Sequence, residues 1–373
     1  MLSPCEVIAF ILLTVTIVFT AFCFSKNNTY LCLMNNGSTV SGSAGSMVGI
    51  LSLMHFLVDG LCVCLLYLMA PHCGEAGIMT VFILYNVTAF LSQPLTGWYA
   101  DRTDNAHATI TAGVAMLALA TVGTVAVCGD VSCIKTLLYV TPVVLGLGNS
   151  LFHVWGGRLT TLCSHNDIRH GGVFVSTGAM GLSVGMVFAS WHLTAVILLS
   201  ICLLTATVIR CYDVPPRRDA SSSMYHVMRS HLSTDEWSRV GAASAMVLVI
   251  ITGLCAIVAL RSMAGSAVSA GLQRSEGIIL AIGFISMLGK AAGGWVARRT
   301  GLVCCMVVAA AATWLCWMYG GGSTVAVLAA LFLINLTMPV TLYLANITLQ
   351  GREGLAFGLL AAALIPGYLI ATV

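Results

Sequence analysis

The sequence has 373 residues, of which 59% are hydrophobic and only 8% are charged. A soluble globular protein carries about 25% charged residues, so this chain lacks the polar surface that water requires. The composition therefore excludes a soluble enzyme, a nucleic-acid-binding protein and a disordered chain. The formal net charge of +3 is too small to indicate a polyanionic partner.

Apolar runs divide the chain into membrane-spanning segments. A spanning helix needs about 20 apolar residues, and the hydrophobic content is enough for roughly eleven such helices. Charged and Gly/Pro/Asn-rich breaks predict a hydrophobic leader at 5–24 and then eleven helices, at 46–70, 76–98, 108–128, 135–156, 170–191, 193–212, 241–261, 275–297, 301–320, 323–346 and 353–373. The predicted fold class is an all-α integral membrane protein.

One long polar stretch, 213–240, separates six predicted helices from five. It divides the chain into an N-terminal hydrophobic segment and tether (1–45), a six-helix half (46–212), the linker (213–240) and a C-terminal half (241–373). Basic residues lie mostly on the linker side of the membrane, which predicts a cytoplasmic linker and a multi-pass protein of the cell membrane. That side holds Lys26, Arg102, Arg158, Arg169, Arg210, Arg217, Arg218, Arg229, Arg239, Lys290, Arg298, Arg299 and Arg352, against Lys135, Arg261 and Arg274 on the other.

Two short segments repeat each other. GWYADRT begins at Gly97 and GWVARRT at Gly294, and both follow a helix that runs toward the linker side. The matching position and direction predict two halves in parallel orientation, each built from six helices.

GWYADR is similar to the loop signature of the major facilitator superfamily. Further stretches resemble its fosmidomycin-resistance-like branch: HFLVDG from His55, QPLTGWYADR from Gln93, GLGNSLFHVWGGR from Gly146 and RHGG from Arg169. The resemblance implies two six-helix halves that rock about a central cavity and move a small molecule by alternating access.

The resemblance also implies a cytoplasmic gate in which the acidic residue of the repeated loop acts as a latch. The second copy has Arg298 where the first has Asp101, so only the first copy is expected to latch in the usual way. The predicted gating residues are Gly97, Asp101, Arg102, Arg158, Gly294, Arg298 and Arg299.

The superfamily usually has twelve helices, and the C-terminal half here provides only five. Three interpretations of the leader at 5–24 stay open. It can fill the twelfth position as in a circular permutation, lie at the periphery as an additional helix, or be processed. MLSPCE, which precedes the apolar run, has no basic residue, and this is unusual for a signal peptide.

Asp59 is the only acidic residue deep within an apolar run. An ionisable group inside the membrane is by default a candidate functional residue, because the bilayer makes it costly. His55 lies one helical turn earlier on the same face, so the pair is predicted to load and release a proton. A buried carboxylate satisfied by local hydrogen bonds is the alternative.

The substrate cavity is predicted from polar residues within other helices: Tyr85, Asn86, Gln93, His153, Arg261 and Lys290. Each has a simpler interpretation. His153 is explained equally well as a hydrogen-bonded packing residue, and Arg261 as a side chain that extends to the membrane surface. Lys290 and Arg261 are each expected to pair with an acidic group or to bind an anionic substrate.

The sequence contains no recognisable metal-site spacing, phosphate-binding loop or nucleophile–base arrangement, so neither an enzyme nor a cofactor is predicted. The predicted function is a proton-coupled secondary transporter, with export of a drug or metabolite suggested by the resemblance. The predicted partners are a small molecule, protons and the lipid bilayer, with no nucleic acid, and the chain is expected to be a monomer. The alternative is a transporter-like sensor or scaffold that does not transport.

Overall fold

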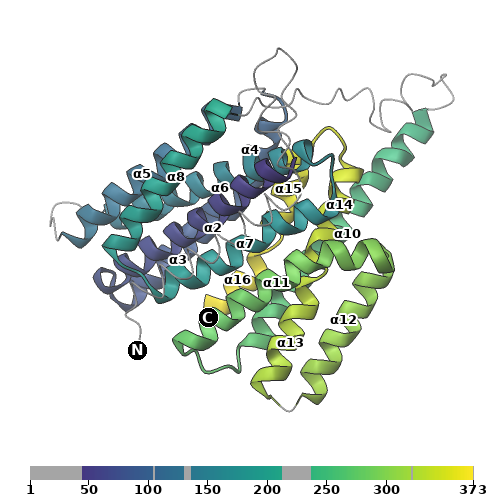
Figure 1. The fold of residues 1–373 in the computed structure, drawn as a ribbon. Helices are drawn as coiled ribbons and strands as arrows, with labels where there is room; N and C mark the ends of the chain where they lie inside the picture. Colours follow the sequence, from purple (N-terminus) through teal and green to yellow (C-terminus); the bar gives the residue numbers. More distant parts are fainter. Residues whose placement is uncertain (1–43, 104–105, 130–135, 212–236, 321, 373) are drawn as a thin grey trace, which may run out of the picture.

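The computed structural model describes residues 44–103, 106–129, 136–211, 237–320 and 322–372. Their regular structure is entirely helical (Figure 1). The α-helices are α2 (Ala44–Met69), α3 (Gly74–Leu91), α4 (Gln93–Ala100), α5 (Ala106–Cys128), α6 (Leu137–Cys163), α7 (Ile168–Val187), α8 (Trp191–Cys211), α10 (Trp237–Ser269), α11 (Glu276–Thr300), α12 (Leu302–Tyr319), α13 (Thr324–Asn335), α14 (Met338–Thr348), α15 (Glu353–Ala362) and α16 (Ile365–Thr372). A 3₁₀ turn, η1 (Ala70–His72), follows α2.

Three of the expected helices are each broken in two. The segment at 76–98 is α3 and α4, that at 323–346 is α13 and α14, and that at 353–373 is α15 and α16. The first break falls at Ser92, directly before Gln93 and Pro94, and Pro94 has no backbone N–H to continue the hydrogen-bond ladder. Ser92, Leu336 and Ala363 keep right-handed helical backbone angles, so the breaks interrupt the regular hydrogen bonding without turning the chain out of its helical path.

Two boundaries differ clearly from the predicted ones. α6 continues to Cys163 instead of ending at 156, so Arg158 lies inside the helix. α10 extends to Ser269 instead of 261, so Arg261 lies two turns before its end. α10 meets no Gly or Pro at the predicted position, and α6 continues through Gly156 and Gly157 because both are buried against aromatic rings of neighbouring helices.

In the described part of the chain, nine helices are long and apolar enough to cross a membrane. α7 is not among these nine, and Glu353–Leu369 qualifies only as a shorter apolar helix. α7 packs along α2 on one side and along α11 on another, so most of its side chains do not face lipid. A helix enclosed in this way does not need an apolar surface.

Small residues bring α2 and α7 close together. Gly181 lies against the backbone carbonyl of Phe56, and Gly185 against that of Gly60. This is the close helix packing that a four-residue spacing of glycines predicts.

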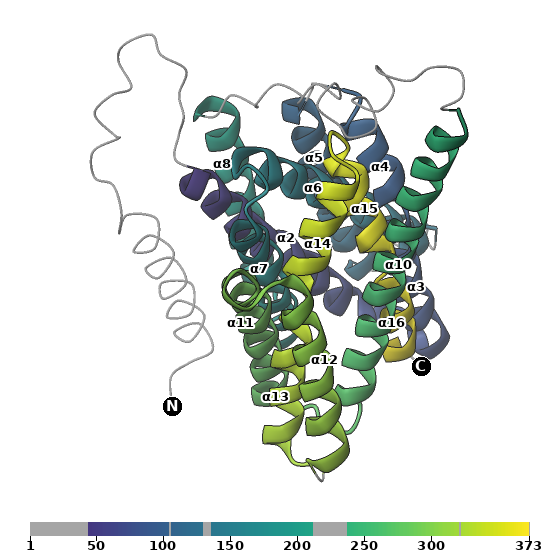
Figure 2. The same cartoon turned by 90° about the vertical axis from the view of Figure 1, so that its right-hand side faces the viewer.

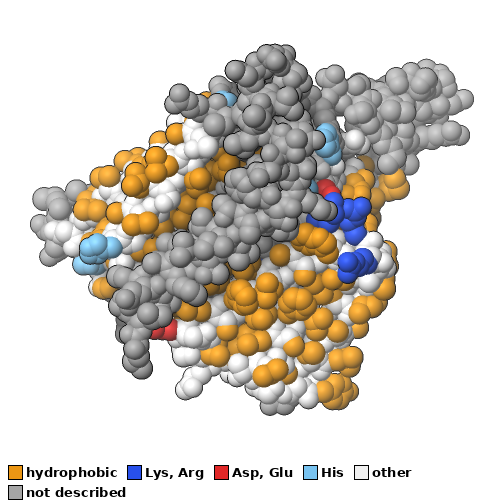
Figure 3. All heavy atoms as spheres, viewed as in Figure 1, with side chains coloured by type: hydrophobic (Ala, Val, Ile, Leu, Met, Phe, Trp, Pro, Cys, Tyr) orange, Lys and Arg blue, Asp and Glu red, His pale blue; other side chains and the backbone are white. Residues whose placement is uncertain are grey.

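The outer face of the bundle is apolar. Leu, Val, Ile and Trp side chains are exposed along α5, α8, α10 and α12, and orange side chains cover much of the described surface in Figure 3. Exposed apolar surface of this extent requires lipid around it. The two views of the ribbon place α5 and α8 on one side of the bundle and α12 and α13 on another (Figures 1 and 2).

The two ends of the bundle differ in charge. The basic end is defined by Asp101, Arg102, Arg158, Asp167, Arg169, Arg298, Arg299 and Arg352, which lie at helix ends or in short connections. The opposite end is defined by the connections after α2, α7 and α10. The leader at 5–24 lies outside the described residues, as does 213–236 of the predicted linker, so the leader's position and the side of the membrane stay predictions.

Replacing Gly181 with Ala should lower the unfolding temperature of the purified protein in detergent. The added methyl group would overlap the carbonyl of Phe56, and overpacking costs about 1–3 kcal/mol. Gly253→Ala is the matched control, because a methyl group there meets nothing within 4 Å and only the helix propensity changes. Equal unfolding temperatures for the two variants would contradict this packing argument.

Candidate functional site

A cavity of about 290 Å³ lies within the bundle between α2, α3, α6, α7, α10, α11, α14, α15 and α16. It extends from Gln93 and Phe357, toward the basic end, to the exposed residues Tyr67 and Arg274 at the opposite end. Its described polar lining consists of His55, Asp59, Tyr67, Tyr85, Asn86, Gln93, His153, Arg261, Arg274, Lys290, Thr341 and Tyr368. The remaining lining is mainly aliphatic and aromatic.

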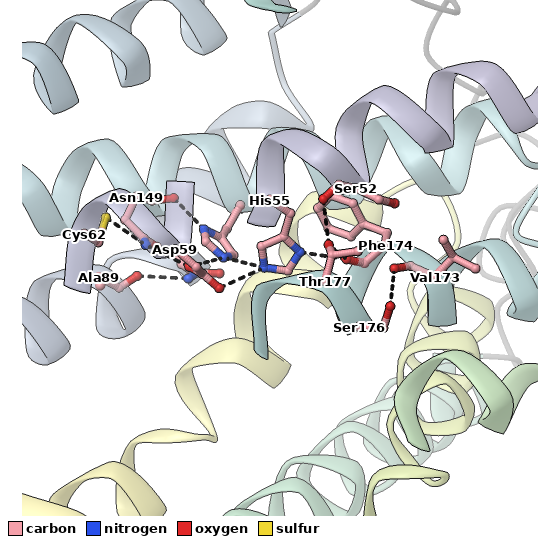
Figure 4. A network of polar contacts seen from close by, with 12 residues as sticks. Ser52, His55, Asp59, Cys62, Ala89, Asn149, Val173, Phe174, Ser176 and Thr177 are labelled. Atoms are coloured by element: carbon pink, nitrogen blue, oxygen red, sulfur yellow. Dashed lines mark hydrogen bonds and ion pairs between the residues drawn. The ribbon is translucent and has the colours of Figure 1, made fainter. Parts of the chain in front are cut away.

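Asp59 lies on one wall of this cavity between two imidazoles (Figure 4). Its Oδ2 is 3.3 Å from Nε2 of His55, one turn earlier on α2, and its Oδ1 is 3.3 Å from Nε2 of His153 on α6. All three side chains are buried. The structure therefore brings the predicted pair together with a residue 94 positions further along the chain.

The hydrogen-bond distances of the two rings bear on where their protons lie. Nδ1 of His55 is 2.7 Å from the carbonyl oxygen of Phe174, and Nδ1 of His153 is 2.9 Å from that of Asn149. A carbonyl only accepts, so both Nδ1 atoms are assigned as donors. In a neutral ring Nε2 would then have only a lone pair, yet the two Nε2 atoms are 2.8 Å apart. Two lone pairs repel at this distance, so the geometry favours one further proton between the rings, balanced by the carboxylate of Asp59.

Asn149 completes this cluster. Its Nδ2 lies 3.4 Å from Oδ1 of Asp59 and 2.9 Å from the hydroxyl of Tyr85, which it links to the carboxylate. Asn149 and His153 are one turn apart on α6, as His55 and Asp59 are on α2. Asn149 was not predicted, although a polar pair at this spacing in an apolar helix is the signal that identified the pair on α2.

The ligand atoms of His55, Asp59 and His153 all lie within 4.8 Å of one another, so the three side chains are also the donor set of a divalent transition metal ion. A tetrahedral ion with metal–nitrogen bonds of about 2.0–2.1 Å holds two nitrogens about 3.3 Å apart. The Nε2 atoms are closer than this, at 2.8 Å.

The other predicted cavity residues on α3 and α4 lie along the same wall. Asn86 donates to the carbonyl of Phe82, and Gln93 donates to that of Ala89 at the helix break. The side-chain oxygen of Gln93 is buried without a hydrogen-bond partner among the described residues. It is thus available to a ligand at the deep end of the cavity.

The opposing wall is cationic. Arg261 is only 8% exposed and lines the cavity, so the prediction that it extends to the membrane surface is wrong. The reason is the greater length of α10, which leaves Arg261 well inside the bundle. Lys290 lies on α11 with its side chain partly exposed to the cavity.

At the basic end, the first repeated loop contacts the N-terminus of α15. Oδ1 and Oδ2 of Asp101 accept hydrogen bonds of 2.9 and 2.8 Å from the backbone N–H groups of Gly354 and Leu355, and Nε of Arg158 lies 3.3 Å from Oδ1. Burial raises the pKa of Asp101, against the effect of these donors. Gly97 lies against the carbonyl of Gly354, so no side chain fits between α4 and α15.

The second repeated loop makes a related contact with α7. Gly294 lies against the backbone of Ile168 and Arg169, and Nη1 of Arg298 is 3.7 Å from Oδ2 of Asp167. Asp167 is the N-cap of α7 and accepts from the backbone N–H of Arg169. Partial burial would raise the pKa of this carboxyl, but its hydrogen bonds with Arg169 and the charge of that side chain hold it below its ordinary value.

Both contacts bring together an arginine and a carboxylate, but the repeated loop supplies the carboxylate in the first contact and the arginine in the second. A carboxylate lies at the N-terminus of α15 in one and of α7 in the other, but Asp101 belongs to the repeated loop and Asp167 to the helix that receives it. Arg102 is exposed with its guanidinium 4.0 Å from the centre of the Trp98 ring, and Arg299 is exposed. Neither joins these contacts.

Comparison with known proteins rests on the fold. No family model matches the chain, and no curated protein matches its sequence. Among solved structures, it is similar to an E. coli fucose:proton symporter, FucP, with a TM-score of 0.59 and 13% identity over 86% of this chain and 88% of that chain. FucP in the outward conformation, described as a major facilitator superfamily transporter, gives 0.60 and 11% over 87% and 89%.

The chain shares its overall fold with these transporters, of which one is described as a member of the major facilitator superfamily. A bacterial homologue of the iron transporter ferroportin in the outward-facing state has a TM-score of 0.51 and 15% identity over 87% of this chain and 91% of that one. These likenesses do not distinguish one branch of the superfamily from another, so the resemblance to the fosmidomycin-resistance-like branch stays a prediction.

Replacing Asp101 with Asn should loosen the N-terminus of α15. A hydrogen bond to a charged group contributes about 1.5–3 kcal/mol, so we expect amide exchange at Gly354 and Leu355 to accelerate roughly tenfold or more, as measured by hydrogen–deuterium exchange mass spectrometry. Asp167→Asn is the matched control and should accelerate exchange at Arg169 instead. Unchanged exchange at both α15 amides in Asp101→Asn would contradict this assignment.

Proposed function

We propose that this chain is a secondary transporter that moves a small molecule by alternating access and couples this movement to protons through Asp59, His55 and His153. The observation that carries the proposal is the pair of Nε2 atoms 2.8 Å apart, beside a buried carboxylate on the cavity wall. In this proposal the two rings share a proton that can leave, and the three side chains line the cavity in which a substrate would bind.

Loss of that proton would change the structure around it. Without it, the lone pairs of the two Nε2 atoms would face each other and the rings would have to separate. The ring of His55 lies 4.8 Å from that of Phe174, and Phe174 lies 6.0 Å from Phe357 on α15. Since α15 is the helix that Asp101 holds, a continuous set of contacts runs from the proton site to the basic end.

Several other groups act on the charge of Asp59. On its own helix these are His55 and Cys62, and from the packed helices they are Tyr85 of α3, His153 and Asn149 of α6, Lys290 of α11 and Tyr368 of α16. α7 contributes Gly178, which is not ionisable. Lys290 is the member of this set that also belongs to the cationic wall, so its charge connects Asp59 electrostatically with the remainder of the cavity.

We further propose that the basic end is the cytoplasmic gate, with Asp101 and Arg158 on one contact and Arg298 and Asp167 on the other. The cavity reaches exposed residues only toward the opposite end, which corresponds to an outward-facing arrangement. The resemblance found in the sequence favours export in exchange for protons, although the solved fold neighbours include a proton symporter.

The altered second loop and the unusual helix count are the two features that favour the sensor or scaffold interpretation, and the structure bears on the first of them. Arg298 has a carboxylate partner in Asp167, so the loss of an acidic residue from that copy does not remove the contact. Transport is therefore the function that the arrangement favours.

The Asp59→Asn variant should lose proton coupling while it keeps its fold. In liposomes containing a pH-sensitive dye, a panel of small organic metabolites that includes amphipathic anions, tested one by one, should reveal a compound that moves protons through the wild-type protein and not through this variant. The direction of the pH change separates import with protons from export against them. Glu276→Gln is the control, because Glu276 is an exposed carboxylate that neither lines the cavity nor belongs to the proposed gate.

Proton flux that survives in Asp59→Asn would remove this residue from the coupling mechanism. A second outcome would also overturn the assignment. If purified wild-type protein binds one Zn²⁺ or Mn²⁺ ion tightly and both Asp59→Asn and His153→Gln abolish that binding, the three side chains form a metal site instead of a proton site.

A further inference from the structure

Two cations of the cavity have no anionic partner in the described part of the protein. Nη2 of Arg261 is buried without a hydrogen-bond partner, and Nη1 reaches only the hydroxyl of Thr341 at 3.5 Å. No hydrogen bond or ion pair joins Lys290 to another residue that the structure describes. A buried charge without a partner costs several kcal/mol. Two such charges line the same cavity here, so their presence requires an explanation.

The charges around the cavity do not balance. Its described lining includes the cations Arg261, Lys290 and Arg274, and Asp59 is its only acidic member. Asp59 is already engaged by two imidazoles, and Lys290 also experiences the positive charge of Arg261. A low-dielectric cavity with an excess of positive charge concentrates anions.

The rest of the lining limits what kind of anion fits. Val63, Leu66, Phe90, Leu360 and Leu364 are apolar, and the ring of Phe90 stacks on that of Tyr368 at 4.7 Å. A volume of about 290 Å³ lies at the low end of small-molecule sites. An inorganic ion would leave most of this apolar surface unused.

We propose that the substrate is a small amphipathic organic anion whose acidic group binds between Arg261 and Lys290 and whose apolar part lies against Phe90 and Tyr368. This inference rests on the proposed transport function and names its substrate class. Carboxylates and phosphonates share the required chemistry, since a guanidinium edge binds either group through paired hydrogen bonds and an ammonium supplies a point charge. The cations come from α10 and α11, whereas the proton site comes from α2 and α6.

Four probes with the same phenyl group test this proposal: benzoate, phenylphosphonate, benzamide and benzylamine. A ligand of the folded state raises the unfolding temperature, so each probe is added to the purified full-length chain in detergent and its affinity is then measured by calorimetry. We expect one or both anions to bind, which distinguishes a carboxylate from a phosphonate site. Benzamide that binds as tightly as the anions, benzylamine that binds better, or no binding of either anion would overturn the proposal.

Variants then locate the binding site. Arg261→Gln and Lys290→Gln should each weaken anion binding about tenfold to a hundredfold, which is the effect of a lost charge-assisted hydrogen bond. Arg261→Lys should recover part of that loss. Arg299→Gln is the control for a change of net charge, since its side chain is exposed at the basic end. Unchanged affinity in both glutamine variants would place the anion elsewhere and overturn the proposal.

Two further measurements complete the test. The first shows whether Arg261 binds the anion or supports the fold, and the second tests the anion site independently of the proposed transport function. Without ligand, Arg261→Gln should unfold at an equal or higher temperature than the wild type, because it removes an uncompensated buried charge; a large decrease would show that Arg261 supports the fold. Asp59→Asn should keep anion binding. Anion binding without proton-coupled flux in liposomes would thus contradict the transport function and leave the anion site in place.

Discussion

The cavity is organised around one constraint, which is that a carboxylate buried in an apolar bundle must be compensated. Asp59 meets this requirement through His55 and His153, and both rings are fixed in turn by backbone carbonyls. One proton shared by the two rings would complete this compensation, and the proposed proton coupling rests on that interaction.

Close contacts between helices fix where this cluster can form. The position of α2 is set by glycines of α7, and Gly178 of α7 leaves the space that the side chains of Asp59 and His55 occupy. α7 also packs along α11, which holds Lys290. The proton site and the cationic wall are thus placed by the same helix, although α7 contributes neither an acid nor a base to the described lining of the cavity.

Much of this architecture follows from the sequence, because lipid and water sort residues strongly. Apolar runs indicated the eleven helices, and the repeated GW-A-RT segment marked the two loops at the basic end, although only the first copy was expected to form a latch. The sequence did not show that His153 meets His55, since 98 residues separate them and pairing across helices leaves no local pattern. The partner of Arg298 was missed for the same reason. Asp167 directly precedes the first residue of α7, where the sequence alone suggests no more than an ordinary N-cap.

The enclosed position of α7 has a consequence for how the protein is made. α7 is not apolar enough to qualify as a span by itself, and it is shielded from lipid by α2 and α11. α2 precedes it in synthesis, but α11 begins about 90 residues after α7 ends. At about 5–20 residues per second, α7 waits roughly 5–20 seconds for its second neighbour. During that interval the face of α7 that packs on α11 has no α11 to cover it, so the packing of α7 is completed only after part of the second half of the chain has been made.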